Sequence, residues 1–296
     1  MEPPYVPPPQ PRPIDPRPPE PAFPLTRDDY SLSDLLSRAS EAWSRDLGAW
    51  VLAMVLYLLI GVGIPVILGF FSGFFVGLQG SGSEWSALRF AVEAVAQVVQ
   101  LVLGAIFTLG FWAMALRGLH GEPARVGALF SQLSKIWKYI LQSIVIGLGL
   151  VLVIAPVLLI IFLAFVGPVD RSTPMSEIME SAGRPLAITL AVAAPFYIYA
   201  VLGIVFAQVE LAFNDDAGPV DALIHSWRIA RGKRWSILGV AIIAGMIMLG
   251  SMMLCGIGVL FGAPFATLLV GALYLALRQG ADVPRADTST TLGARY

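Results

Sequence analysis

The sequence predicts an all-α, polytopic membrane protein with six transmembrane helices and three amphipathic helices at the cytoplasmic interface. Hydrophobic residues make up 57% of the 296 residues and charged residues 13%, against roughly 45–50% and about 25% in soluble domains. Several uncharged runs are long enough to cross a bilayer, because about 20 helical residues cover about 30 Å of hydrocarbon. An amphipathic segment also recurs twice, each time 94 residues further along the chain.

This repeated segment places apolar residues at helical spacing ahead of each odd-numbered span. The three sets are Leu32, Leu35, Leu36, Ala39 and Trp43; Val126, Leu129, Phe130, Leu133 and Trp137; and Val220, Leu223, Ile224 and Trp227. A face of this kind, with polar residues opposite, is typical of a helix lying in the membrane interface.

We therefore expect interfacial helices at 31–46, 123–139 and 220–231, each feeding a membrane hairpin. The result would be a pseudo-threefold repeat, with units at about 31–118, 119–214 and 215–280. The alternative is that these segments are the amphipathic loops that any multi-span protein carries at its cytoplasmic face.

Residues 1–30 form a predicted cytoplasmic arm. Twelve of the 22 prolines lie in residues 1–24, a composition that favours extended polyproline II over packed structure. We expect a disordered arm that is either a solvated spacer or, through Pro4 and Pro7, a ligand for an aromatic groove of a protein partner. Ser31 and Asp34 then have the spacing of a capping box, which predicts the start of the first interfacial helix.

The first two spans are expected within 47–83, which carries no charge, and at about 88–116. Pro65 should kink the first of them. Glu93, Gln97 and Gln100 share one face of the second, and this face should turn toward the bundle or the outer interface, because polar groups facing lipid are costly. It is a candidate polar pathway for a solute or proton; hydrogen bonding between helices is the alternative.

Spans three and four are expected at about 139–166 and 185–209, with a polar loop between them. Glu210 follows the fourth span and is expected to pair with a nearby arginine or lysine. The last uncharged run, 235–277, has 43 residues, which is twice what one span needs. It predicts two spans joined by a tight turn at 255–258, and residues 281–296 should form a disordered tail.

The basic residues predict the orientation of the spans. Sixteen of the 19 lysines and arginines fall on one side of the six-span arrangement, and Arg89, Arg171 and Arg184 fall on the other. The positive-inside rule therefore places both termini in the cytoplasm. The first 46 residues contain no apolar run suited to a signal peptide, so the first span should act as an uncleaved anchor.

The third amphipathic segment is the richest in cations and indole rings. Its candidate lipid-headgroup contacts are Trp227, Arg228, Arg231, Lys233, Arg234 and Trp235. Each basic residue near an anionic leaflet contributes about 1 kcal/mol of attraction, and tryptophan favours the headgroup level. Membrane phospholipids are therefore the expected partners, and ordinary anchoring of the topology is the alternative.

No arrangement of residues predicts catalysis or a metal site. The single cysteine, Cys255, excludes an intrachain disulfide, and His120 and His225 have no recognisable metal-ligand spacing. The sequence has no nucleophile–base arrangement, no phosphate-cradling loop and no basic domain for nucleic acid. We expect no catalytic residue, cofactor, metal or nucleic-acid partner.

Residues 221–239, together with 255–258, Pro264 and 272–274, resemble a group of uncharacterised bacterial six-span membrane proteins. The group includes the membrane domain attached to some glycerophosphodiester phosphodiesterases. In it, a pattern like Ala-x-x-x-Ser-Trp-x-x-x-x-Gly-x-x-Trp precedes the last hairpin. The resemblance implies the six-span fold and a bacterial inner (plasma) membrane location. It implies no chemistry, because the family members that hydrolyse phosphodiesters use a separate soluble domain that this chain lacks.

These patterns together predict a non-enzymatic integral membrane protein. It would organise or sense lipid, or a partner protein, through its cytoplasmic amphipathic helices. The alternative is a small transporter or lipid-translocating protein, which is favoured by Pro65, Pro156 and Pro195 within the spans and by the polar face of span two.

Overall fold

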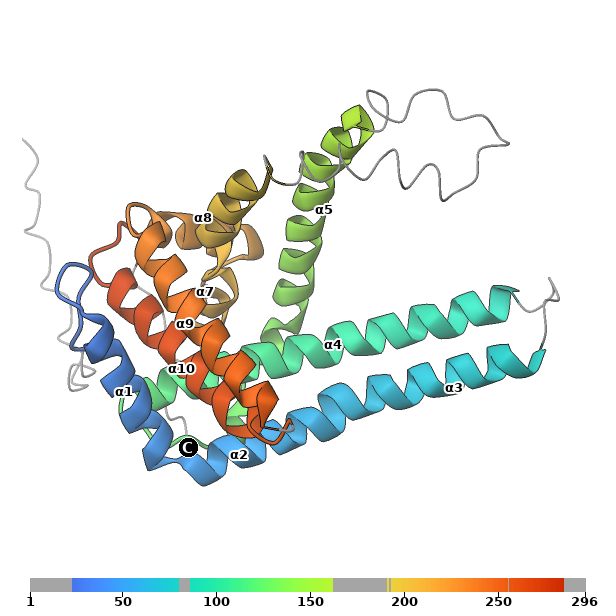
Figure 1. The fold of residues 1–296 in the computed structure, drawn as a ribbon, viewed down its shortest axis with the longest axis horizontal. Coiled ribbons are helices and arrows are strands. Elements are labelled where there is room, and N and C mark those ends of the chain that lie inside the picture. The colour runs from blue at the N-terminus through green and yellow to red at the C-terminus, as the bar shows by residue number, and fades with distance from the viewer. Residues whose placement is uncertain (1–22, 80–85, 162–190, 192, 255, 285–296) are drawn as a thin grey trace, which may run out of the picture.

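The computed structural model describes residues 23–79, 86–161, 191, 193–254 and 256–284, and all regular structure among them is helical (Figure 1). Six stretches are long and apolar enough to cross a membrane: Leu47–Phe71, Phe90–Leu119, Val126–Leu152, Ala193–Phe213, Arg234–Met253 and Val259–Arg278. The predicted all-α class is therefore confirmed, and the described residues contain the predicted number of helices that are long and apolar enough to cross a membrane.

The chain enters the fold through α1 (Leu32–Arg45), which begins as the sequence predicts. The backbone N–H of Asp34 donates to Ser31 Oγ at 3.2 Å, and the N–H of Ser31 donates to the Asp34 carboxylate at 3.0 Å. The hydrogen bonds from Ser31 lower the pKa of the Asp34 carboxyl. One face of α1 is buried against α10 through Leu35, Ala39 and Ala42.

The first span is assembled from α2 (Leu47–Leu56), a π-helical stretch (Tyr57–Val62) and α3 (Gly63–Gln79). Pro65 lies in the first turn of α3, where we expected a kink. Proline has no N–H to donate, and its ring crowds the carbonyl four residues earlier. The π-helical stretch lies at that point, and Gly63 donates to the carbonyl of Leu58, one residue further back than in an α-helix.

The predicted second interfacial helix, 123–139, is wrong. Two 3₁₀ turns occupy Val126–Phe130 and Leu133–Lys135, and α5 (Ile136–Ile161) follows them. The backbone of Leu129 lies so close to α4 (Ser86–Leu119) that a Cβ on Gly110 would be 2.3 Å from the Leu129 carbonyl oxygen. This contact buries Leu129 and leaves Trp137 70% exposed. The five predicted apolar positions therefore do not form one face, and the threefold repeat is not confirmed.

The second half of the chain continues from helical residues 193–204 into α7 (Ala207–Phe213) and α8 (Pro219–Ala230). The last hairpin is α9 (Arg234–Met253) and α10 (Val259–Arg278). The tight turn between them lies where it was predicted, with Gly256 at φ +77°. A Cβ on Gly258 would lie 2.3 Å from the carbonyl oxygen of Ser251, so this close approach requires glycine. Cys255 lies outside the described residues.

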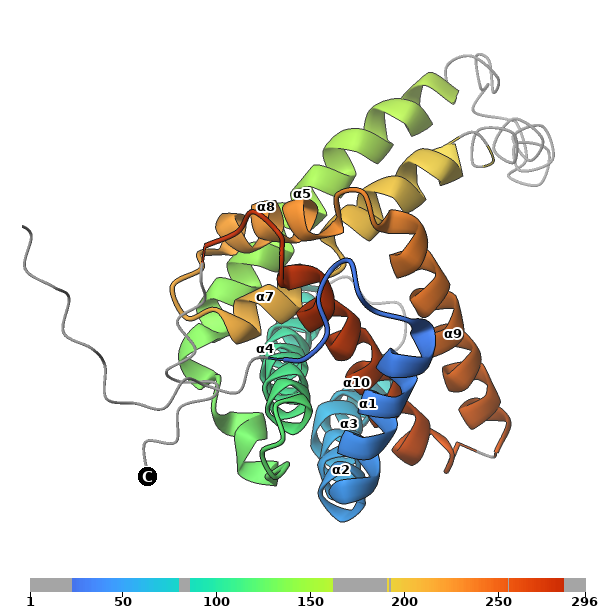
Figure 2. The same ribbon diagram turned by 90° about the vertical axis from the view of Figure 1, so that its left-hand side faces the viewer.

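Helix α10 is the centre of the molecule and packs against α1, α2, α4, α8 and α9 (Figure 2). Its C-terminal half is buried from Leu268 to Leu277, except for the partly buried Val270. Gly271 allows close packing, because a Cβ there would lie 3.1 Å from the side chain of Leu119 on α4. Away from α10, the α3–α4 hairpin and α5 diverge from each other (Figure 1).

Residues 23–30 belong to the arm that we predicted to be disordered, yet they pack against the ends of α8 and α10. Phe23 is buried, and the Arg27 guanidinium donates to the carbonyls of Ile229 at 3.1 Å, Leu277 at 3.4 Å and Arg231. The last carbonyls of a helix have no intrahelical partner, so a guanidinium there stabilises both helix ends. Residues 1–22 of the arm and 285–296 of the tail lie outside the described residues.

Candidate functional site

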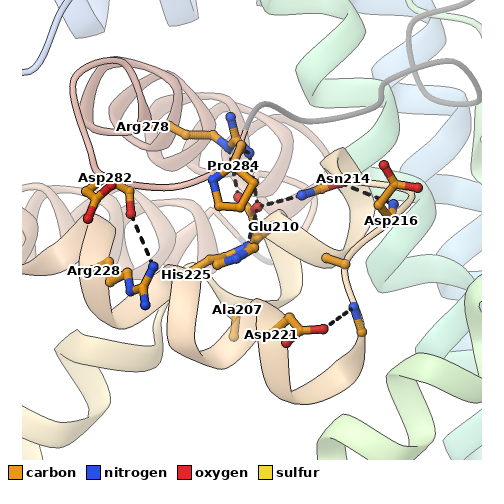
Figure 3. Close-up of polar contacts among 12 residues, drawn as sticks. Ala207, Glu210, Asn214, Asp216, Asp221, His225, Arg228, Arg278, Asp282 and Pro284 are labelled. Carbon is orange, nitrogen blue, oxygen red and sulfur yellow. Dashed lines mark hydrogen bonds and ion pairs between the residues drawn. The ribbon is translucent and has the colours of Figure 1, made fainter. Parts of the chain in front are cut away.

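The most polar part of the interior surrounds Glu210 on α7, which is fully buried (Figure 3). Tyr274 Oη donates to one carboxylate oxygen at 2.5 Å, and Arg278 Nε donates to the same oxygen at 2.9 Å. The other oxygen accepts hydrogen bonds from Arg278 at 3.1 Å, His225 Nδ1 at 3.1 Å and Asn214 Nδ2 at 3.2 Å. We call these five residues the polar hub.

The polar hub joins α7, α8 and α10 through one carboxylate. A buried carboxylate is strongly unfavourable unless it is paired and hydrogen-bonded. Arg278 supplies the opposite charge with a bidentate contact, and the Tyr274, His225 and Asn214 donors satisfy the remaining acceptor positions. Every polar atom of Glu210 is occupied, so the hub fixes three helices and leaves no carboxylate oxygen for a substrate.

A second set of polar contacts joins α5 to the connection between α7 and α8. Lys135 donates from Nζ to the carbonyls of Leu211 and Ala212 at 3.0 Å each, and it pairs with Asp215. Lys138 donates to the carbonyls of Asp215 at 2.9 Å and Ala217 at 3.1 Å. Lys135 therefore caps the C-terminal end of α7, and Lys138 holds the connection that follows it.

Where α8 meets α9, an arginine lies against two aromatic rings. Cζ of Arg234 is 3.5 Å from the ring centroid of Tyr199 and 4.4 Å from that of Trp227. The two rings meet edge to face, with centroids 6.0 Å apart. We call Tyr199, Trp227 and Arg234 the basic–aromatic corner. It brings together the helical residues 193–204, α8 and the first residue of α9.

The other predicted headgroup contacts lie around this corner. Lys233 pairs with Asp28 at 3.5 Å, and Arg228 donates to the carbonyl of Asp282 at 3.5 Å. The side chain of Arg231 is exposed, and Trp235 is 85% exposed. The six residues lie together at the junction of α8 and α9, and Arg228, Lys233 and Arg234 also make contacts within the protein.

Helix α8 turns its predicted apolar face outward. Val220, Ile224 and Trp227 are exposed, although Trp227 is only 40% exposed because its ring packs on Gly203. The face that packs inward carries the apolar side chains of Ala222, Ile229 and Ala230. It also carries two polar ones: Ser226, which donates to the carbonyl of Gly203 at 2.9 Å, and His225 of the polar hub. The exposed apolar side chains of α8 are therefore held in place by apolar packing and by polar contacts on the opposite face.

The candidate polar pathway lies far along α4 from this region. Glu93, Gln97 and Gln100 are all exposed in the N-terminal half of α4. A cavity of about 180 Å³ lies at the other end of α4, between α1 and the residues after Gly118. Its charged and polar lining residues are Arg38, Glu41, Arg45 and His120. The three predicted pathway residues do not line it.

Sequence reasoning identified part of this arrangement. It expected Glu210 to pair with a basic residue, and Arg278 is that residue. It missed Tyr274, His225, Asn214 and Tyr199. Tyr274 and Arg278 are four residues apart and therefore share a face of α10, but only the fold aligns that face with Glu210. Among the described residues, no group of three or more His, Cys, Asp or Glu could hold a metal ion.

Comparison with known families gives one match. A family model described as a domain of unknown function, DUF7847, matches residues 86–291. No curated protein and no solved structure matches the chain. The matched segment runs from α4 into the C-terminal tail, so it includes both the polar hub and the basic–aromatic corner.

Proposed function

The chain belongs to the family of the domain of unknown function DUF7847, and we propose that it is a non-enzymatic integral membrane protein that gathers anionic phospholipid at its cytoplasmic surface. The lipid-binding surface is formed by α8 and the start of α9, with Trp227, Arg228, Arg231, Lys233, Arg234 and Trp235 as its contacts.

The observation that carries this proposal is the outward apolar face of α8 beside a group of cations. Val220, Ile224 and Trp235 are exposed, and they precede or begin a helix long and apolar enough to span a membrane. Apolar side chains at that depth favour the acyl and glycerol region, while the basic side chains next to them favour anionic headgroups.

The polar hub supports the same function indirectly. It holds the inner face of α8 through His225 and Glu210, so the outer face keeps a fixed orientation relative to α9 and α10. A surface fixed in this way loses little conformational entropy when lipid binds. The orientation we propose follows the positive-inside rule, with α8 and both termini in the cytoplasm.

The transporter alternative has less support. Its polar residues Glu93, Gln97 and Gln100 are exposed and do not line the cavity between α1 and the end of α4. The resemblance of residues 221–239 to the membrane domain of some glycerophosphodiester phosphodiesterases agrees with a lipid-facing role and is part of the same proposal.

The test uses the full chain reconstituted in liposomes of equal phosphatidylglycerol and phosphatidylcholine, then extracted with its surrounding lipid by a styrene–maleic acid copolymer. We expect the extracted lipid to be enriched at least about twofold in phosphatidylglycerol. The triple variant R228Q/R231Q/K233Q should bring the ratio toward one, because each basic residue near the anionic surface contributes about 1 kcal/mol.

The matched control is R38Q/R285Q/R295Q, which removes the same charge outside α8 and α9 and should keep the enrichment. Equal recovery of the two lipids by the unaltered chain would show that the proposal is wrong. If the control variant lost the phosphatidylglycerol enrichment to the same extent, the enrichment would be an effect of net charge and not of the α8–α9 surface.

A further inference from the structure

Arg234 differs from the other basic residues of the lipid-binding surface because the protein holds it in place without pairing it. Its guanidinium lies against the rings of Tyr199 and Trp227. Its Nε is buried and has no hydrogen-bond acceptor among the described residues. By contrast, the neighbouring Lys233 pairs with the carboxylate of Asp28.

An oriented guanidinium with an unused donor indicates a ligand. Buried polar atoms in folded proteins are almost always hydrogen-bonded. An unpaired one therefore points to a water, ion or ligand that binds it in the functioning protein. Contact with aromatic rings restricts the rotamers of an arginine and is most favourable where water is excluded. The rings cover the flat faces of the guanidinium, and beyond the buried Nε its two terminal nitrogens carry the remaining N–H donors in a planar fork.

The chemistry of this fork fits a phosphate group. A guanidinium binds two phosphate oxygens through parallel, charge-assisted hydrogen bonds, which an ammonium cannot do. Arg234 is also the first residue of α9, whose N-terminus has no side-chain cap, so the helix adds a positive potential near the arginine. Ile224 and the 85% exposed Trp235 lie nearby in sequence and suit the apolar part of a lipid.

We propose that Arg234 forms a discrete phosphate-binding site for the headgroup of one anionic phospholipid, with Tyr199 and Trp227 as positioning residues. This inference rests on the proposed lipid-gathering function and makes it specific, because it requires one saturable site in addition to a general attraction. A free phosphate ion has the same chemistry, and the experiment separates the two sources.

Gly203 provides a way to disturb the site without touching its charge. A Cβ at this position would lie 2.3 Å and 2.4 Å from two carbon atoms of the Trp227 ring, Cε3 and Cζ3. No atom pair of this kind can remain so close, so Gly203→Ala must move the ring of Trp227. The variant keeps every charge of the lipid-binding surface and alters the support of Arg234.

The experiment is native mass spectrometry of the full chain in a mild detergent, titrated separately with phosphatidylglycerol, phosphatidylcholine and inorganic phosphate. We expect one phosphatidylglycerol to bind with an affinity distinct from later additions. R234Q should weaken that first binding about tenfold, as expected for loss of one charge-assisted interaction. R234K should weaken it about threefold, because the charge remains but the planar fork is lost.

R38Q is the charge-matched control and should change the first binding less than twofold. G203A should weaken it as R234K does, and an unchanged thermal unfolding temperature in each variant would show that the fold is intact. If a variant unfolds, the part of the tryptophan quenching by brominated phosphatidylglycerol that is lost in Trp227→Phe still reports whether lipid reaches the corner, because six other tryptophans contribute to the total signal.

Each outcome decides between the two proposals. If R234Q and R38Q weaken lipid binding equally, the discrete site is excluded while a general anionic preference stands. If the unaltered chain does not distinguish phosphatidylglycerol from phosphatidylcholine, the lipid-gathering function fails as well. Saturable binding of inorganic phosphate that equals the lipid in affinity would overturn the headgroup assignment.

Discussion

Among single residues, Glu210 makes the buried polar contacts that join α7 to α8 and α10. It lies at the end of a span, is fully buried, and receives hydrogen bonds from side chains on α8 and α10 and from Asn214 at the end of α7. The attraction between Glu210 and Arg278 must offset the desolvation of both groups, so removing one partner leaves an uncompensated charge in the interior. The pair is therefore expected to be strongly coupled.

Arg278→Met and Glu210→Gln should each lower the free energy of unfolding by about 3 kcal/mol, at the lower end of the range for broken buried ion pairs. The double variant should lose clearly less free energy of unfolding than the two single variants together, because neither charge is then left without its partner. Thermal unfolding in detergent, followed through tryptophan fluorescence, measures these losses for the two single variants and the double variant. Glu93→Gln on the exposed face of α4 is the control and should be nearly neutral; additive losses would contradict the coupling.

Between elements, the recurring device is a basic side chain that binds the carbonyls at another helix's end. Arg27 caps α8 and α10, and Lys135 caps α7. Arg45 donates to the carbonyl of Gly118, near the end of α4, at 2.7 Å. The basic residues on which the predicted orientation rests thus also donate hydrogen bonds to carbonyls at helix ends, which have no partner within their own helix. Their positions along the sequence predicted the orientation of the spans in the membrane, but not that they would cap other helices.

Lys135→Met tests this role because it keeps the aliphatic side chain and removes the ammonium. We expect a loss of about 2 kcal/mol, since hydrogen bonds to a charged donor contribute about 1.5–3 kcal/mol. Backbone amides of residues 211–217 should also exchange with deuterium faster than in the unaltered chain. Arg38→Met, on the exposed surface of α1, should leave both measurements unchanged. Unaltered exchange in Lys135→Met would show that the cap is dispensable.

For the whole molecule, the proposed six-span topology places α8 and the segment before α5 on the same side of the membrane. In a Cys255→Ser background, Arg125→Cys and Arg231→Cys should resist a membrane-impermeant maleimide in intact cells and react after permeabilisation. Ser176→Cys, in the segment expected on the opposite side, should react in both conditions. If positions 125 and 231 reacted from different sides, the proposed topology would be wrong.

The sequence by itself determined the class, the number of helices long and apolar enough to span a membrane, the start of α1, and the bounds of α8 to within one residue. These features depend on local properties, namely the length of uncharged runs, the spacing of apolar residues and the capping signals, which act within a few residues of each other. The clustering of the six candidate headgroup residues followed for the same reason, because they lie within nine consecutive positions of the chain.

Only the tertiary structure decided the conformation of 126–135 and the composition of the polar hub. Residues 126–135 have an amphipathic pattern, but the close contact of Leu129 with Gly110 overrides it and gives two 3₁₀ turns. Glu210 and Tyr274 are 64 residues apart, and helical periodicity does not say which faces of two distant helices meet. That pairing depends on the packing of α10 against its neighbours, which is a property of the assembled molecule.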